Sequence, residues 1–135
     1  MKRATALLAL LLFALSTLML AETVNMTPSP AVPSAQGDLN VEHDSNGNMV
    51  VTVHVKHLAQ PSSLSPAKSA YIVWLQPQDQ PAQPAGVLRV DKDLSGELKT
   101  SAPSKRFDVF VTAEDSPTAQ QPNGEALLRG TVLPK

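Results

Sequence analysis

The strongest constraint on the fold is an alternation of apolar and polar residues from Asp38 to Leu58, centred on Asn46-Gly47. A period of two indicates β-strands, and Asn-Gly between two such runs indicates a hairpin. A two-residue loop would set apolar side chains opposite polar ones, whereas a three-residue loop with a left-handed Gly47 pairs Val41 with Val51. Since a one-residue slip moves every side chain to the other face, we predict the three-residue loop. The predicted buried face consists of Leu39, Val41, Val51, Val53 and Val55.

Further short apolar runs follow, each bounded by turn-forming residues. Residues 71–75 are apolar on both faces, as in a central strand, and residues 107–114 alternate. Other strands are expected at 86–90, at 97–100 on a sheet edge, and within 126–133. No segment after residue 21 has a helical apolar period, and 12 prolines punctuate the chain. We therefore predict an all-β fold, an antiparallel β-sandwich of about seven strands and immunoglobulin-like size.

The N-terminus has the layout of an export signal. Lys2 and Arg3 precede a stretch from Ala4 to Ala21 that carries no charge. This layout is typical of a secretory signal peptide, here expected to be helical, spanning 1–21 and cleaved after Ala21. The alternative is an uncleaved anchor, because about 18–20 apolar residues can span a bilayer. We expect a periplasmic or secreted protein, with membrane contact only if the segment is retained.

The remainder of the chain divides into a leader and one domain. Residues 22–36 are rich in Pro, Ser and Thr and are predicted to be a poorly ordered leader. Residues 37–135 are expected to form the β-sandwich domain. The chain contains no cysteine. The domain must therefore be stabilised by packing without disulfides, and no lipid-modified cysteine can anchor it.

Composition argues against nucleic-acid binding. The formal net charge is −1 at pH 7, and removal of Lys2 and Arg3 would make the chain more acidic. Proteins that bind nucleic acid need a surplus of Lys and Arg to meet the phosphates. The aromatic residues also lie inside apolar runs, where core packing explains them. We therefore expect no nucleic-acid partner.

Catalytic motifs are absent from the sequence. There is no Gly-x-Ser-x-Gly pattern and no cysteine to act as a nucleophile. Glu114 and Asp115 are adjacent at a strand end, which aims their carboxylates apart, so paired-carboxylate hydrolysis is not indicated. We expect a protein that is not an enzyme and that uses no cofactor.

Two features raise the alternative of a metal site. Asp91 and Asp93 lie in a turn that matches the first half of a calcium loop, but Ala102 stands where a bidentate Glu would be needed. His43, His54 and His57 suggest copper or zinc. However, His54 points away from the face that the other two share on the predicted hairpin. A cross-strand pair between His54 and Asp38 is the preferred interpretation, and we predict no metal.

Four residues are the candidates for a binding surface: Tyr71, Trp74, Phe110 and Glu114. Tyr71 and Trp74 face opposite sides of their strand, and Phe110 faces away from Phe107. Joint exposure of Trp74 and Phe110 would create an apolar patch suited to a partner. Burial of both would instead indicate core packing.

The segment from Ser69 to Leu133 resembles the C-terminal extracytoplasmic domain of the anti-sigma-K factor family. The resemblance rests on the runs at 71–75, 86–88 and 109–114, on Pro122-Asn123-Gly124, and on the last apolar strand with Gly130. It implies a β-sandwich that acts as an extracytoplasmic module. Only Met1 to Arg3 precede the apolar segment, so we expect no cytoplasmic sigma-binding domain here.

These observations lead to two expectations about function. The first is a non-catalytic module of the cell envelope that binds an envelope protein or ligand, or serves structurally. The alternative is a small periplasmic domain that binds copper, zinc or calcium.

Overall fold

The computed structural model describes residues 21–103 and 105–134, so residues 1–20 of the predicted signal peptide lie outside it. Within these ranges, no helix has the length and apolar character needed to cross a bilayer. The one helical element named in them is a single 3-10 turn, η2 (Pro61–Ser63). The prediction of an all-β chain is confirmed for the described residues.

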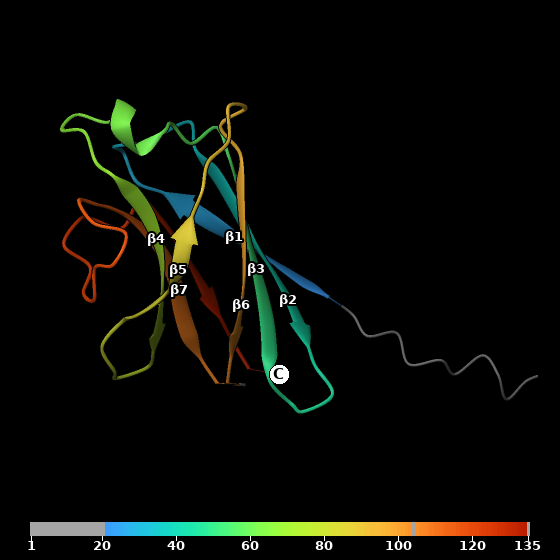
Figure 1. The fold of residues 1–135 in the computed structure, drawn as a ribbon. Helices are drawn as coiled ribbons and strands as arrows, with labels where there is room; N and C mark the ends of the chain where they lie inside the picture. Colours follow the sequence, from blue (N-terminus) through green and yellow to red (C-terminus); the bar gives the residue numbers. More distant parts are fainter. Residues whose placement is uncertain (1–20, 104, 135) are drawn as a thin grey trace, which may run out of the picture.

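Eight antiparallel strands form one sheet that curls until its two end strands approach each other (Figure 1). The order across the sheet is β5-β4-β7-β8-β1-β2-β3-β6. Val90 and Gly96 form a bridge next to the turn that joins β5 to β6, so the barrel is nearly closed there. The strands are β1 (Glu22–Pro28), β2 (Gln36–His43), β3 (Met49–Lys56), β4 (Ala70–Pro77), β5 (Gln83–Leu88), β6 (Gly96–Ala102), β7 (Phe107–Glu114) and β8 (Leu128–Val132).

Strand β1 corrects the prediction of a disordered leader over residues 22–36 and of seven strands. Its first part, Glu22–Met26, pairs with β2, and Thr27 and Pro28 pair with β8. Met26 is buried in the core, as are Val32 and Ala35 in the connection to β2. The Pro and Ser content suggested a leader, but the Val24 and Met26 alternation with polar residues is a strand pattern. The predicted leader therefore belongs to the folded part, which was expected to start at residue 37.

The hairpin of β2 and β3 confirms the predicted register. Val41 lies opposite Val51, and Leu39 lies opposite Val53. Gly47 has a φ of 82°, which is the left-handed conformation expected for a three-residue loop. All five residues of the predicted face are buried. This face forms one wall of the main core, and residues of β4, β7 and β8 form the opposite wall.

Two turns of the sheet have the same hydrogen-bond pattern. In the β2–β3 turn, Asp44 Oδ1 accepts the N–H groups of Asn46 and Asn48. In the β5–β6 turn, Asp91 Oδ1 accepts those of Asp93 and Ser95 in the same way. The fourth residue of each turn is left-handed: Gly47 in the first and Leu94, with a φ of 63°, in the second. Leucine carries a steric cost in this conformation that glycine does not.

Exchanging the residue types at these two positions should change stability in opposite directions. Leu94→Gly should raise the free energy of unfolding by about 0.5–1 kcal/mol, because the left-handed strain is relieved. Gly47→Ala should lower it by about 1–2 kcal/mol for the reverse reason. Urea unfolding monitored by the fluorescence of the single tryptophan measures both changes. A loss of stability in Leu94→Gly would show that Leu94 contributes more by contact than it costs by strain.

Candidate functional site

Tyr71 points into the main core and is fully buried. Its hydroxyl donates a hydrogen bond to the carbonyl oxygen of Ala59 at 2.5 Å. Burial disfavours the phenolate and raises the pKa of Tyr71 to about 12. Tyr71 thus links β4 to the loop after β3, and its ring offers no surface to a ligand.

Because Tyr71 is the only tyrosine of the chain, a spectroscopic titration reports on it alone. Absorbance near the phenolate band should show no ionisation at pH 10.0, the usual pKa of the group, and ionisation only towards pH 12. The raised pKa means that the contribution of Tyr71 to stability is complete below pH 10.0 and is lost as pH rises from there. Ionisation at pH 10.0 in the folded protein would contradict the buried position.

Trp74 and Phe110 project from the outer face of β4 and β7, as the alternation predicts, but they do not form an exposed patch. Trp74 is 0% exposed and Phe110 is 4% exposed. Their rings stack with centroids 6.5 Å apart, and the Arg129 guanidinium lies 4.5 Å from the Phe110 centroid. Together with Ile72 they make a second apolar cluster, which we call the outer cluster. Of the two alternatives, burial of both residues is therefore the one found, because the β7–β8 connection covers this face.

The cover is the segment of residues 115–127, which we call the β7–β8 loop (Figure 1). Ala119 and Ala126 of this loop pack against the outer cluster. At its far end, the Leu127 N–H donates to the Val111 carbonyl oxygen at 2.7 Å. At its near end, Lys68 forms an ion pair with Asp115 at 3.4 Å. The hydrogen bond and the ion pair thus fix the two ends of the loop on the sheet. Its alanine side chains are small enough for the loop to pack closely against the outer cluster.

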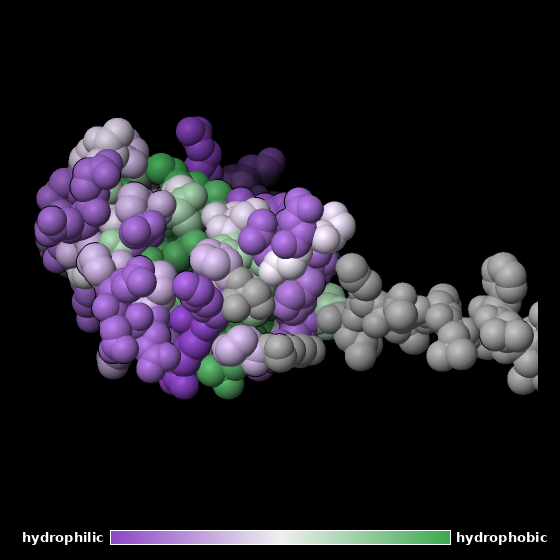
Figure 2. All heavy atoms as spheres, turned by 90° about the horizontal axis from the view of Figure 1, so that it is seen from below, coloured by the Kyte–Doolittle hydropathy of each residue, from purple (hydrophilic) through white to green (hydrophobic). Residues whose placement is uncertain are grey.

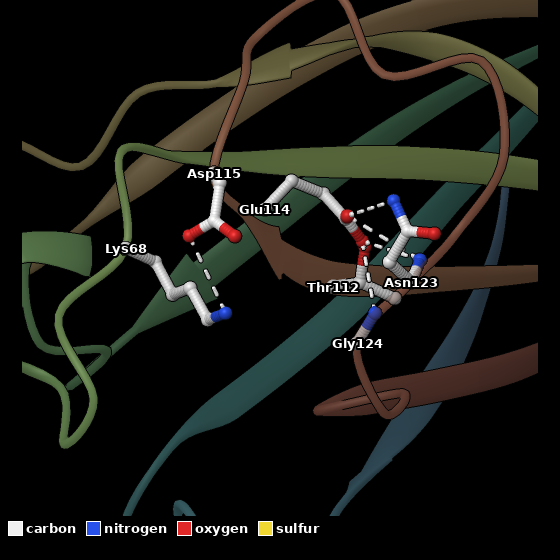
Figure 3. Close-up of polar contacts among 6 residues, drawn as sticks. All are labelled: Lys68, Thr112, Glu114, Asp115, Asn123 and Gly124. Carbon is white, nitrogen blue, oxygen red and sulfur yellow. Dashed lines mark hydrogen bonds and ion pairs between the residues drawn. The ribbon is translucent and has the colours of Figure 1, made fainter.

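Glu114 is buried and holds this loop through a network of buried and partly buried hydrogen bonds (Figure 3). The Trp74 indole N–H donates to Thr112 Oγ1 at 2.7 Å, and the Thr112 hydroxyl donates to Glu114 Oε2 at 2.5 Å. The other donors come from the loop: the Asn123 N–H and side-chain amide, and the Gly124 N–H, at 3.1 to 3.3 Å. A Cβ on Gly124 would lie 2.8 Å from the Ala113 carbonyl oxygen, so the close approach requires glycine.

The network sets the charge state of Glu114. Burial by itself raises the pKa of this carboxyl, but the hydrogen bonds from Thr112, Gly124 and Asn123 outweigh burial and lower the pKa below its usual value. The carboxylate is therefore ionised near neutral pH, and its oxygens are occupied by donors from the protein. A charged but fully engaged carboxylate is a structural anchor, and it has no free acceptor for a substrate proton.

The residues considered for a metal site do not converge. Among the described residues, no three His, Asp or Glu side chains lie close enough to hold an ion. His54 Nδ1 lies 3.7 Å from Glu97 Oε2 of β6. Asp38 is its neighbour in register on the other side, so the preferred Asp38 pairing gives way to Glu97.

The remaining metal candidates do not form a cluster within the described residues. His43 ends β2 beside Met49, whereas His57 is exposed, with a φ of 57°, after β3. Asp91 directs Oδ1 at backbone N–H groups of its own turn. Asp93 in the same turn is exposed. The Asp91 contacts account for the calcium-like sequence as turn chemistry.

A groove lies where the two end strands separate, at the lower end of the barrel. Its volume is about 360 Å³. Leu75, Ala85 and Phe107 give it an apolar lining, and Thr100 and Ser101 of β6 form one wall. Figure 2, which views the molecule from below, shows hydrophobic residues at the centre of this end with hydrophilic residues around them. Sequence reasoning missed this groove.

Strand β5 runs from Gln83 to Leu88 instead of the predicted 86–90. Its sequence contains two features that indicate an irregular sheet edge beside the groove. Pro84 lacks an N–H, and proline inside a strand is typical of a sheet edge. Ala85 has no partner in β4, because Val73 pairs with Gly86 and Trp74 pairs with Pro84. An irregular edge strand of this kind cannot form a continuous ladder with β6.

Comparison with known proteins gives no functional assignment: no family model matches the chain, and searches of curated proteins and of solved structures found no significant match.

Proposed function

We propose that this chain is an exported, non-catalytic module of the cell envelope that binds a partner protein at the groove between β5 and β6. The observation that carries the proposal is the conjunction of an apolar lining with an unpaired strand edge in the same groove. Most proteins cover their apolar surfaces and their unpaired strand edges. An edge that stays open can pair with an extended segment of another chain.

A non-catalytic role is supported by the state of the polar side chains. The buried carboxylate of Glu114 is engaged by five hydrogen bonds, and the described residues contain no metal-binding group. An acid or base for catalysis needs a free position within reach of a substrate. The buried carboxylate of Glu114 lacks such a position, because both of its oxygens already accept hydrogen bonds from the protein.

The resemblance to the extracytoplasmic domain of the anti-sigma-K factor family supports the same role. Three separate pieces of that pattern, Trp74, Glu114 and Asn123-Gly124, belong to one hydrogen-bonded network. These residues together hold the β7–β8 loop on the sheet, which is a physical reason for them to occur in one sequence pattern. We therefore propose that the module is periplasmic or secreted and that its fold is a β-sandwich of immunoglobulin-like size.

Site-specific photo-crosslinking in cells tests the proposal. A photoreactive amino acid at Ser101, which lines the groove, should give an adduct with another protein, whereas the same group at exposed Glu42 of β2 should give none. The chain should be recovered outside the cytoplasm with its N-terminus at Glu22. Retention in the cytoplasm would reject export. Adducts at both positions, or at neither, would reject partner binding at the groove.

A further inference from the structure

Strand β6 has one edge that is almost free of strand pairing in the described part of the chain. This strand pairs with β3 along its whole length. On its other side, the only pairing within the described residues is the Val90–Gly96 bridge at its start. In an antiparallel pair, alternate residues direct their N–H and C=O groups away from the partner. From Glu97 to Ala102, the outward groups of β6 therefore have no strand partner.

The groove begins where contact between β5 and β6 ends. At Gly86, a Cβ would lie 3.2 Å from the Leu98 side chain, so Leu98 fills the space between the strands at that level. Below it the strands diverge around Ala85 and Thr100. Pro84 and the bulge at Ala85 make β5 a poor hydrogen-bonding wall. An incoming chain would find its backbone partner in β6 alone.

The charges around the lower end of the groove indicate the chemistry of the incoming chain. Of the 11 Lys and Arg residues in the sequence, Lys99, Lys105 and Arg106 lie on β6 or in its connection to β7. Lys105 lines the groove, Lys99 precedes Thr100 of its wall, and Arg106 lies in an adjoining hollow with Asp79 and Asp108. Lys99 and Lys105 form no ion pair with any described residue, and Glu97, nearer the other end of β6, lies 3.7 Å from His54 Nδ1. The groove of a chain with net charge −1 thus has a basic rim. An acidic segment complements this rim and is steered towards it.

We infer that the groove takes an extended, acidic segment of a partner protein, which adds a strand to the free edge of β6. The inference rests on the proposed function and names the form and charge of the partner. Backbone hydrogen bonds to β6 would provide affinity. Alternate apolar side chains of the segment would enter the lining at Leu75 and Phe107, and its acidic side chains would face Lys99 and Lys105.

The test uses the purified chain and synthetic peptides of about eight residues, a common strand length. The first peptide alternates Val and Glu, the second replaces Glu by Lys, and the third is the Val-Glu peptide with N-methylated backbone amides. At about 50 mM salt, where screening is weak, the Val-Glu peptide should shift the amide resonances of residues 97–102. The Lys peptide should bind at least about tenfold more weakly, and the N-methylated peptide should lose binding.

Charge-reversal variants provide the matched control. Lys99→Glu with Lys105→Glu should lower affinity for the Val-Glu peptide and raise it for the Lys peptide. Lys56→Glu with Lys92→Glu makes the same change in net charge at exposed positions away from the groove lining and should leave both affinities unchanged. Equal losses in the two double variants would show a general charge effect and overturn the inference.

Three other results would also overturn it. They are no shift of residues 97–102 with any peptide, equal binding of the N-methylated peptide, and concentration-dependent self-association through β6, which would make a second copy the occupant. If Ser101 gives adducts in cells while the Val-Glu peptide fails to bind, the acidic strand is rejected and the proposed function stands. If both fail, both are rejected.

Discussion

Replacing Glu114 by alanine should lower the free energy of unfolding by about 3–5 kcal/mol, because one buried donor and several partly buried donors lose a charged acceptor at once. The donors left behind include the Thr112 hydroxyl and the N–H groups of Asn123 and Gly124. Urea unfolding monitored by Trp74 fluorescence measures the loss. Trp74 is a direct reporter, since its indole donates to Thr112 in the same network.

Glu114→Gln separates the charge from the shape of the side chain. The amide keeps one acceptor oxygen but presents an NH₂ group to backbone donors, so we expect a loss of about 1–3 kcal/mol. Glu125→Gln is the matched control: it makes the same chemical change at an exposed position of the same loop and should alter stability by less than about 0.5 kcal/mol. Equal effects at the two positions would mean that the network does not hold the loop.

The same carboxylate should make stability depend on acid pH. Its pKa is lower in the folded protein than the usual value of 4.5. The contribution of Glu114 is therefore complete above pH 4.5 and is lost as pH falls from there through the folded pKa. In Glu114→Gln this part of the pH dependence should disappear. An unchanged acid slope in that variant would assign the pH dependence to other carboxylates.

Replacing Phe110 by alanine should cost about 3–5 kcal/mol, the range for truncating a buried aromatic residue. Phe110 lies on the outer face of the sheet, where a solvated side chain would cost little to remove. It is nevertheless 4% exposed, stacked on Trp74 and covered by the β7–β8 loop. A decrease of this size in the free energy of unfolding would show that the outer cluster acts as a second core.

Two further readouts accompany this variant. The Trp74 emission should shift to longer wavelength, and the β7–β8 loop should become easier to cleave by protease, because Ala119 and Ala126 lose their packing partner. Leu133→Ala, at a residue 55% exposed, should change stability by less than about 0.5 kcal/mol. A loss of similar size in Leu133→Ala, or no emission shift in Phe110→Ala, would contradict a covered outer cluster.

The parts of the fold that local chemistry determines could be predicted from the sequence. The β2–β3 register follows from period-two alternation and from the left-handed Gly47, which are both properties of neighbouring residues. The strand at 107–114 was predicted at its observed bounds for the same reason. By contrast, the Pro and Ser content around β1 outweighed a weaker alternation, and the strand was missed. Local composition is a poor guide where tertiary pairing supplies the stability.

The candidate site depended on contacts between distant segments, and these could not be predicted. Alternation placed Trp74 and Phe110 on the outer face correctly, but the β7–β8 loop, which covers them, carries no periodic signal. The groove depends on how far β5 and β6 separate below Leu98, and no residue pattern encodes that separation. His54 pairs with Glu97 because β6 lies beside β3, an adjacency the hairpin alone does not reveal.

The pairing of β1 with β8 also bears on how the chain folds. Thr27 lies opposite Arg129, so the first strand of the sheet is joined to the last. Contacts between residues so distant in sequence must overcome a large loop-closure entropy, and sheets built from them fold slowly, in milliseconds to seconds. The ring of strands cannot be completed during synthesis before β8 is available. Until then β1 lacks its β8 partner, and the sheet of the growing chain stays incomplete.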